Sequence, residues 1–450
     1  MSRYVGPKFG RVLGLVPGVT ATGAIAGWFT YGIVRCMTSD RTLAREFDLI
    51  VYGATGFVGR LLSDYLARYA PAGTRIALAG RSESKLAELS GYLPGPGGSW
   101  PLIVADANDD AALDALASRT TVVVSTVGPY LKYGLGLVAA CAKNGTHYAD
   151  LTGETLFVRQ IIDDHDELAQ STGARIVNSC GFDSIPSDLG VLLAFEHARD
   201  HGLGHLTDTT LVVRAMKGGF SGGTIDSMRT TVDVVKADPK LKAIVNDQFA
   251  LSPDRSNEPT RRQPKDTALV ARSSDVGGWV GPFVMADYNT KIVRRSNALQ
   301  NWAYGPEFTY REVSSFGKGP LAPLLAVGMG AGMWAAWVGM GIKPMRAVLD
   351  RTLPDPGEGP SEEQRRAGRF LIEVHANTST GSEVVTRIGA SGDPGYQATS
   401  VMLAESALSL ALDGDRLPDR AGVLTPATAL GDVLIERLRK ADFVATAKTL

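Results

Sequence analysis

The chain has 450 residues, of which 44% are hydrophobic and 21% charged, and its formal net charge is -1. These values are ordinary for a globular protein of two or three domains, and without a basic excess they give no sign of nucleic-acid binding. The three cysteines, Cys36, Cys141 and Cys180, lack the spacing of metal ligands. The sequence therefore predicts no structural metal site and no disulfide framework, a pattern typical of a reducing compartment.

The N-terminal segment is apolar at residues 12–34 and follows three basic residues. That arrangement is typical of a signal peptide or an N-terminal anchor. Met37 opens a stretch that leads directly into the first predicted strand, so an extension upstream of the working protein explains the segment as well. We expect residues 1–45 to lie outside the fold.

Short apolar runs alternate with helical patterns over residues 46–204. The runs are nearly continuous and rich in β-branched residues, as in strands that are buried on both faces of a parallel sheet. The predicted strands are 47–53, 75–80, 101–106, 121–126, 147–151 and 174–180, and the predicted helices are 57–70, 83–90, 109–118, 133–144 and 154–171. This alternation predicts an α/β domain with a doubly wound parallel sheet, the Rossmann arrangement.

The pattern changes beyond residue 205. A longer half-polar strand at 207–219, two strands within 370–390 and an amphipathic helix at 396–412 predict a second α+β domain. We expect this domain, residues 205–420, to carry substrate and dimer contacts. Residues 421–450 are predicted to form a C-terminal helix that packs back on the Rossmann domain.

One further stretch, residues 319–345, has no charge between Lys318 and Lys343. It is long enough to span or enter a bilayer, and its many small residues suit close helix packing. Two interpretations stay open: a buried helix or dimer contact, and a segment that faces membrane or lipid.

A turn with three glycines joins the first strand to the first helix. The first glycine lets the chain leave the strand sharply, the second lets a pyrophosphate approach the backbone, and the third lets the helix pack closely on the sheet. The free N–H groups and the dipole of the helix favour the anion. The predicted contacts are Gly53, Thr55, Gly56, Phe57, Val58 and Gly59. The alternative is a tight turn without a ligand.

The end of the second strand indicates which dinucleotide is bound. Enzymes that prefer NAD place Asp or Glu there for the ribose 2′-hydroxyl. This chain has Arg81 and Ser82, with Lys85 one turn later. A guanidinium pairs with a 2′-phosphate that a carboxylate would repel, so we expect NADP(H); Arg81 as a solvated surface residue is the alternative. Asp106 ends the third strand, where it either approaches the adenine or caps a helix.

The end of the fourth strand lies, in this architecture, along the nicotinamide and its ribose. Ser125, Thr126, Gly128 and Pro129 are the predicted contacts. Tyr130 follows them, and it either stacks nearby, donates a proton or is simply packed.

Five stretches together, "GATGFVG", "AGRSESKL", "VGPY", "YADLTGE" and "GFDSIPSDLG", resemble the saccharopine dehydrogenase-like oxidoreductases. With "PGYQATSVMLAESAL", the chain is similar to the actinobacterial trans-acting enoyl reductase branch, from about Phe47 to its end. The resemblance implies a reductase that acts on an enoyl thioester substrate carried by a polyketide synthase, in cell-envelope lipid assembly. It also implies membrane association.

The carboxylates in these stretches are Asp150, Glu154 and Asp183. Asp183 falls at the crossing between the two domains, where it serves either as a general acid with a raised pKa or as a hydrogen-bonding group. Hydride would pass to the β-carbon of the enoyl thioester, and a proton to the α-carbon from water or a nearby acid.

Two rival functions stay open: a saccharopine-type dehydrogenase of an amino acid, and a non-catalytic NADP-binding scaffold at the membrane. The first needs basic residues for substrate carboxylates, and Arg214, Lys217 and Arg229 are available. The predicted location is the cytoplasm, with association at the inner face of the plasma membrane, and a homodimer fits the second domain.

Overall fold

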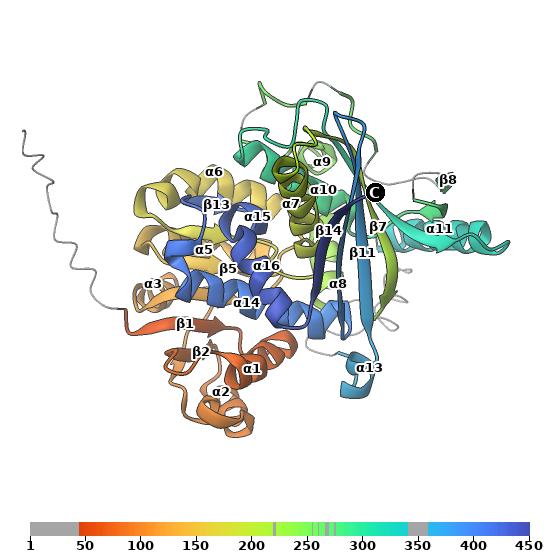
Figure 1. Cartoon of the computed structure of the whole chain (residues 1–450). Coiled ribbons are helices and arrows are strands. Elements are labelled where there is room, and N and C mark those ends of the chain that lie inside the picture. Colours follow the sequence, from red (N-terminus) through yellow and green to blue (C-terminus); the bar gives the residue numbers. More distant parts are fainter. Residues whose placement is uncertain are drawn as a thin grey trace, which may run out of the picture. The chain divides into compact units, whose positions relative to one another are not determined.

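The computed structural model describes residues 45–450 except 219–221, 254, 260, 266–269, 274–275 and 341–358 (Figure 1). The predictions made for residues 1–44 and for 341–345 lie outside the described residues. Residues 45–450 form one compact unit.

The first sheet is parallel throughout, with seven described strands in the order β13-β6-β5-β4-β1-β2-β3. Its strands are β1 Phe47–Tyr52, β2 Ile76–Gly80, β3 Leu102–Val104, β4 Thr120–Ser125, β5 His147–Ala149, β6 Arg175–Val177 and β13 Gly422–Leu424. The order reverses between β1 and β4, so the carboxyl ends of these two strands border the crevice where such sheets bind ligands. The predicted Rossmann arrangement is confirmed.

Helices cover both faces of this sheet, because successive strand residues point to opposite sides. On one face, Ile50 and Val123 pack beneath α3 (Asp110–Ser118), α5 (Leu135–Asn144) and α6 (Thr155–Thr172). On the other face, Val51 and Val124 pack beneath α1 (Phe57–Tyr69) and α14 (Thr399–Leu412). Two further helices, α2 (Glu83–Tyr92) and α4 (Tyr130–Tyr133), follow the ends of β2 and β4 in the chain.

The position of α14 corrects the predicted domain limits, which placed helix 396–412 in the second domain. In the structure α14 packs on α1 and on strands β1, β4 and β5. The reason is that α7 (Ile185–Asp200), which follows β6, packs on the second sheet instead. The face of the first sheet that carries Val51 and Val124 is therefore covered in part by α14, a helix from far along the chain.

The second sheet has seven described strands in the order β14-β12-β11-β7-β10-β9-β8. Its strands are β7 Leu206–Lys217, β8 Ala271–Ser273, β9 Gly278–Gly281, β10 Thr309–Gly317, β11 Arg369–Thr378, β12 Glu383–Ser391 and β14 Val444–Thr449. Helices α7 and α10 (Ala286–Leu299) cover one face. The other α-helices among the described residues are α8 Gly222–Ala237, α9 Leu241–Asn246, α11 Ala322–Met340, α13 Glu362–Arg366, α15 Pro426–Ala429 and α16 Gly431–Lys440.

The C-terminal thirty residues differ from the single predicted helix. They form β13, the two helices α15 and α16, and then β14. β13 extends the first sheet beside β6, whereas β14 pairs with β12 at the edge of the second sheet. The sequence pattern misses both strands because β13 has three residues and β14 is half polar.

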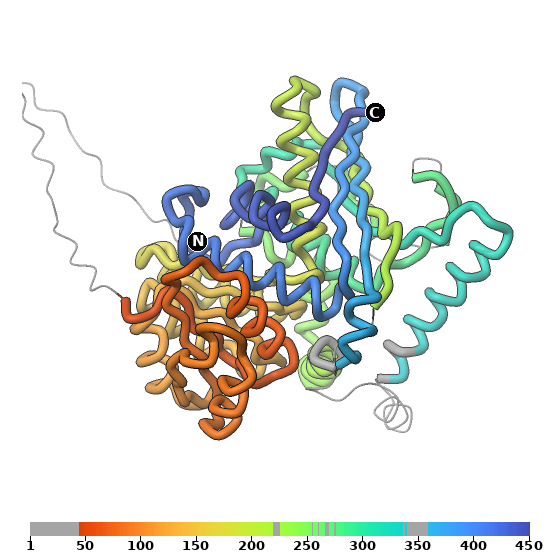
Figure 2. The backbone as a smooth tube through the Cα atoms, turned by 60° about the horizontal axis from the view of Figure 1, so that its bottom comes forward, coloured from red at the N-terminus to blue at the C-terminus, as the bar shows by residue number. Residues whose placement is uncertain are grey.

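Helix α11 projects beyond β9 and β10 at the periphery of the second sheet (Figure 2). Much of its apolar surface is exposed, so the buried-helix interpretation of this stretch is wrong for the described residues. No helix in the described part of the chain is long and apolar enough to cross a bilayer.

Candidate active site

The glycines of the first turn have the roles that their spacing predicts. Gly53 has φ +84°, and an added Cβ would lie 2.6 Å from Cγ2 of Val127. A Cβ on Gly59 would lie 2.2 Å from the carbonyl oxygen of Gly53, so α1 can approach the strand end only with glycine here. Gly56 is exposed. A Cβ added to Gly56 would lie 3.3 Å from its nearest neighbour, which is the carbonyl oxygen of Gly53. Its outer side is open to a ligand.

The first turn of α1 offers free hydrogen-bond donors. The amide of Arg60 donates to the carbonyl of Gly56 at 2.9 Å, so the amides of Phe57, Val58 and Gly59 have no partner within the helix. The Arg60 Nε donates to the carbonyl of Thr55 at 3.0 Å and fixes the turn. A cradle of amides, kept open by glycine at a helix N-terminus, fits the diphosphate of a dinucleotide.

The predicted 2′-phosphate site lies at the ends of β2 and β3. Ser82 caps α2, because its Oγ accepts from the amide of Lys85 at 3.5 Å. Arg81 is exposed and forms no ion pair with any described residue. Asp106 accepts from the amide and the side chain of Asn108, both at 2.9 Å, and these bonds lower its pKa. Asp106 therefore shapes the turn before α3, and Arg81 is a cation available to a phosphate.

The end of β4 is tied to the glycine turn. The amide of Thr126 donates to the carbonyl of Tyr52 at 3.0 Å, and its Oγ1 donates to the carbonyl of Gly53 at 3.0 Å. The Ser125 Oγ accepts from the amide of Val127 at 3.4 Å. The peptide bond between Gly128 and Pro129 is cis. The predicted diphosphate and nicotinamide contacts thus lie along one edge.

Tyr130 is buried, and its hydroxyl is fully used by the backbone. The hydroxyl donates to the carbonyl of Ser125 at 3.2 Å and accepts from the amide of Leu151 at 3.1 Å. Burial raises its pKa well above the ordinary value. Of the interpretations open from the sequence, the packed and positioning role is therefore the one that this geometry favours.

Glu154 fixes the backbone at the start of α4. One of its carboxylate oxygens accepts from the amide of Tyr130 at 2.8 Å and from the Oγ of Ser227 at 2.6 Å. The other oxygen accepts from the amide of Leu131 at 2.9 Å. Ser227 belongs to α8, so the buried carboxylate links the Rossmann strand ends to the second domain.

Asp150 organises the ends of β5 and β6. Its carboxylate accepts from the amides of Thr152 and Ser179 at 3.0 and 2.9 Å and from the side chain of Asn178 at 2.8 Å. Burial raises the pKa of Asp150 to about 6, against the opposing effect of these bonds. Ser179 is held at φ +65°, which is uncommon for a residue with a side chain. Its Oγ lies 2.6 Å from the hydroxyl of Tyr288 on α10.

Asp183 lies in the turn before α7 and differs from the other carboxylates. It is partly exposed, and no described residue forms a hydrogen bond with it. Desolvation raises its pKa to about 6. Burial is the main cause of the raised pKa values of the Tyr130 and Tyr288 hydroxyls. The negative charges of Asp150 and Asp183 raise both pKa values further, so these four groups lie close together. A carboxyl group with a raised pKa therefore lies near the strand ends where the coenzyme contacts are predicted.

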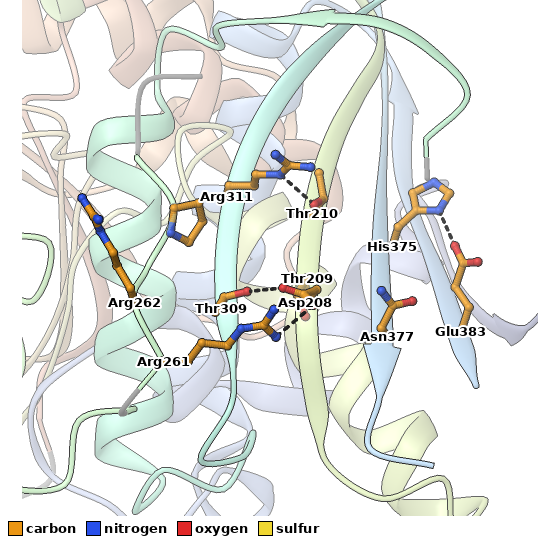
Figure 3. Close-up of a pocket in the computed structure, with 11 residues that line it drawn as sticks. Asp208, Thr209, Thr210, Arg261, Arg262, Thr309, Arg311, His375, Asn377 and Glu383 are labelled. Carbon is orange, nitrogen blue, oxygen red and sulfur yellow. Dashed lines mark hydrogen bonds and ion pairs between the residues drawn. The ribbon is translucent and has the colours of Figure 1, made fainter. Parts of the chain in front are cut away.

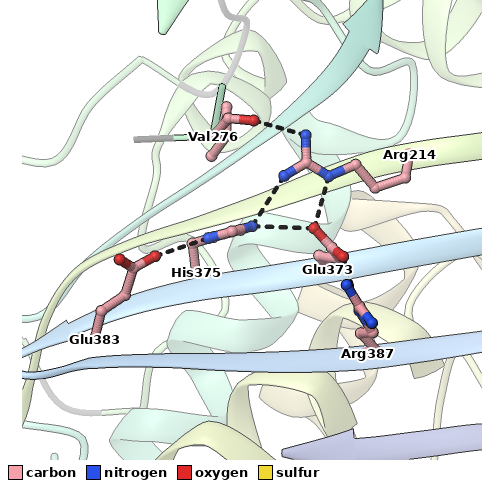
Figure 4. Close-up of polar contacts among 6 residues, drawn as sticks. All are labelled: Arg214, Val276, Glu373, His375, Glu383 and Arg387. Carbon is pink, nitrogen blue, oxygen red and sulfur yellow. Dashed lines mark hydrogen bonds and ion pairs between the residues drawn. The ribbon is translucent and has the colours of Figure 1, made fainter. Parts of the chain in front are cut away.

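Arg214, one of the basic residues that an amino-acid dehydrogenase could use, forms a network on the second sheet. Arg214 donates to Glu373 at 2.7 Å and to the carbonyl of Val276 at 2.7 Å (Figure 4). Burial alone would raise the pKa of Glu373, but Arg214 and Arg387 lower it to about 2. The group lies on the face of the second sheet turned away from α7, so Arg214 is committed to a structural network.

The same face of the second sheet carries a hollow of about 410 Å³ (Figure 3). Its charged lining is largely paired: Arg261 with Asp208 at 2.9 Å and His375 with Glu383 at 2.9 Å. It shares no residue with the strand ends of the first sheet, so it is separate from the predicted coenzyme contacts.

Comparison with known proteins identifies the family. Residues 49–177 match the saccharopine dehydrogenase NADP binding domain. A Mycobacterium tuberculosis protein (strain ATCC 25618 / H37Rv), provisionally named a trans-acting enoyl reductase, is 49% identical over 404 residues, covering 88% of this chain and 96% of that protein. The trans-acting enoyl reductase of Mycobacterium ulcerans (strain Agy99) is 44% identical over 417 residues, covering 90% and 99%. The chain belongs to the trans-acting enoyl reductase family.

Apo saccharopine dehydrogenase (L-Glu forming) from Saccharomyces cerevisiae has a similar structure, with a TM-score of 0.50 and 13% identity, covering 89% of this chain and 99% of that chain. At this identity the similarity shows the fold alone. As a member of the trans-acting enoyl reductase family with an NADP-binding domain, the chain is an NAD(P)H-dependent oxidoreductase.

All predicted coenzyme contacts, from Gly53 to Pro129, lie within the matched domain, and Asp183 lies just beyond it. Sequence reasoning missed Tyr288, Ser179 and Ser227 in this reductase. Tyr288 and Ser227 are separated from the strand ends by long stretches of chain and carry no local motif, so only the fold brings them there. Ser179 had a weak signal, since it lies near the end of the predicted strand 174–180, just before the "GFDSIPSDLG" stretch. Among the described residues, no group of acidic, His or Cys side chains could hold a metal ion.

Proposed function

We propose that the chain is an NADPH-dependent enoyl reductase that acts on acyl or polyketide thioesters. The observation that carries the proposal is the position of Asp183, a carboxyl group with a pKa of about 6 and no hydrogen-bond partner in the described part, beside the coenzyme edge. The printed names of the family members add the reaction type. When bound, the reduced nicotinamide supplies a hydride.

The residues of this chain bind, orient and supply a proton. Asp183 in its acid form protonates the α-carbon of the substrate, because a general acid works best with a pKa near the working pH. Its partial exposure lets solvent restore the proton. Tyr130 and Glu154 hold the strand-end turn in shape through the backbone.

Selection of NADPH over NADH is assigned to Arg81. The end of β2 carries no carboxylate, and the exposed Arg81 has no ion-pair partner among the described residues. A guanidinium there favours a 2′-phosphate through charge and paired hydrogen bonds.

Helix α11 is proposed to contact a lipid surface at the inner face of the plasma membrane. Leu321, Leu324 and Trp334 are 66%, 68% and 69% exposed, which is unusual for large apolar side chains in one segment. Lys318 precedes the helix and Lys343 follows it in the sequence, so basic groups flank the apolar stretch. Apolar area flanked by basic residues favours an anionic lipid surface. The predicted homodimer stays a prediction.

The test is oxidation of NADPH by the full chain in the presence of crotonyl and long-chain enoyl thioesters, followed by absorbance. Turnover with an enoyl thioester supports the proposal. Turnover only with an amino-acid or keto-acid pair would support a saccharopine-type dehydrogenase. Tight NADPH binding without turnover on any acceptor would support a scaffold.

A further inference from the structure

Helix α13 brings a cation from the second domain to the start of α1. Its N-terminus has a capping box between Ser361 and Gln364. Its end is fixed to the turn before α14, because the amide of Asp393 donates to the carbonyl of Arg365 at 2.8 Å. Gly368 lets the backbone after α13 lie against the backbone of Asp393, since an added Cβ would lie 2.3 Å from Cα of Asp393. α14 itself packs on the Rossmann sheet, so the position of α13 is fixed relative to the glycine turn.

The ring of Phe57, the first residue of α1, is surrounded by this region. Tyr396 contacts it edge-on at 4.8 Å between ring centroids. The backbone of Gly359 lies against it, because an added Cβ would be 2.4 Å from the ring. The guanidinium carbon of Arg365 lies 5.4 Å from the ring centroid. The residue whose amide opens the phosphate cradle is thus covered by an arginine from outside the NADP-binding domain.

The charge of Arg365 is not neutralised by an ion pair within the described residues. Its Nη1 donates to the carbonyl of Pro360 at 2.7 Å, and its buried Nε has no hydrogen-bond partner in the described part of the chain. Asp393 is the carboxylate near it: burial raises the pKa of Asp393, whereas backbone hydrogen bonds and the charge of Arg365 lower it, and no ion pair joins the two side chains within the described residues. The neighbouring Arg366 is different, being exposed and paired with Glu362. A half-buried guanidinium that forms no ion pair with a described residue and lies over the ring of the first residue of α1 is suited to an anionic ligand.

We propose that Arg365 is a coenzyme-binding residue that supplies positive charge to the diphosphate of the dinucleotide. The inference rests on the proposed coenzyme and not on the identity of the acyl substrate. It makes tight coenzyme binding depend on the second domain as well as on the Rossmann domain. Arg81 then contacts the 2′-phosphate, and Arg365 contacts the diphosphate.

The experiment measures dissociation constants by calorimetry for the full-length wild type, Arg365→Gln, Arg365→Lys and Arg366→Gln. The ligands are NADPH, NADH, ADP-ribose and 2′-AMP, of which only 2′-AMP lacks the diphosphate. We expect Arg365→Gln to weaken the first three about tenfold, to leave 2′-AMP unchanged and to reduce the salt dependence of NADPH binding. Arg365→Lys should recover part of the loss, and Arg366→Gln should match the wild type.

Unchanged affinity of Arg365→Gln for ADP-ribose would overturn the inference, even if its thermal midpoint fell, because Arg365 would then only join the two domains. Equal weakening of 2′-AMP and ADP-ribose would also overturn it. Failure of the wild type itself to bind NADPH would instead remove the coenzyme assignment on which the proposed function stands. Coenzyme binding without enoyl turnover would leave the role of Arg365 measurable and refute only the reductase proposal.

Discussion

The hydroxyl of Tyr288 lies 2.6 Å from the Oγ of Ser179, which joins α10 of the second domain to the end of the Rossmann sheet. Both groups are buried, and Ser179 has a positive φ. Strained backbone persists only where its surroundings hold it. This contact therefore links the geometry of the strand ends to the second domain.

Tyr288→Phe should lower the free energy of unfolding by about 1 kcal/mol, because it leaves a buried hydroxyl without this partner. We also expect a lower kcat/KM with an enoyl thioester, since the support of Ser179 is weakened. Urea unfolding and steady-state rates measure the two effects. Tyr92→Phe is the matched control, because Tyr92 is 80% exposed. An unfolding free energy equal to that of the wild type would show that the contact does not stabilise the protein.

Asp183→Asn should remove activity while stabilising the fold. Loss of a general acid costs about 10²–10⁴-fold in kcat, whereas NADPH affinity should change little. The folded pKa of about 6 lies above the ordinary 3.8, so the native protein holds the proton more tightly than the unfolded chain. The contribution of the Asp183 carboxyl to the free energy of unfolding is fully present below about pH 4 and is lost as the pH rises through about 6. At pH 7 the uncharged Asn should stabilise by about 1–3 kcal/mol.

Thermal unfolding at pH 4 and at pH 7 tests whether Asp183→Asn stabilises the protein. The variant should be more stable than the wild type at pH 7 and not at pH 4. The wild-type kcat should also fall as the pH rises above about 6, because the acid form is depleted. A variant that is both less stable at pH 7 and fully active would contradict both statements.

Arg81→Gln should weaken NADPH about 10–100-fold, by loss of a charge-assisted pair with the 2′-phosphate. The affinity for NADH, which lacks that phosphate, should stay within about twofold and serves as the internal control. Fluorescence titration with each coenzyme measures the ratio. Equal losses for the two coenzymes would place Arg81 away from the 2′-phosphate.

Gly59→Ala should abolish coenzyme binding, because its Cβ would lie 2.2 Å from the carbonyl oxygen of Gly53 and force α1 away from the strand. Gly91→Ala is the matched control in α2, where an added Cβ meets nothing within 4 Å. That control should stabilise by about 0.5–1 kcal/mol through helix propensity. NADPH titration and thermal unfolding of both variants decide the matter, and normal binding by Gly59→Ala would refute the packing argument.

Replacement of Leu321, Leu324 and Leu325 by Glu should reduce sedimentation with vesicles of anionic lipid by about tenfold or more, because exposed apolar area drives such binding. The control is Tyr92→Glu, a charge placed at an exposed aromatic residue elsewhere. Enzyme rates with a short soluble thioester should not change. If the triple variant sediments like the wild type, α11 is not the lipid contact.

The sequence by itself determined the Rossmann sheet, the glycine turn and the Arg81 position. These depend on local relations, since strand, turn and helix follow one another within about thirty residues. It also identified Asp183 as a candidate, although only desolvation in the folded chain raises its pKa. Burial of that kind cannot be derived from neighbours in sequence.

Only the tertiary structure decided where the distant parts of the chain lie. It placed α14 on the first sheet, divided the C-terminal residues between both sheets, and brought Tyr288 to Ser179 and Arg365 to Phe57. Except for the pairing of β14 with β12, each of these joins residues that are more than a hundred positions apart in the sequence. Their contacts follow from how two sheets share one core, and a local pattern of residue types carries no information about that packing.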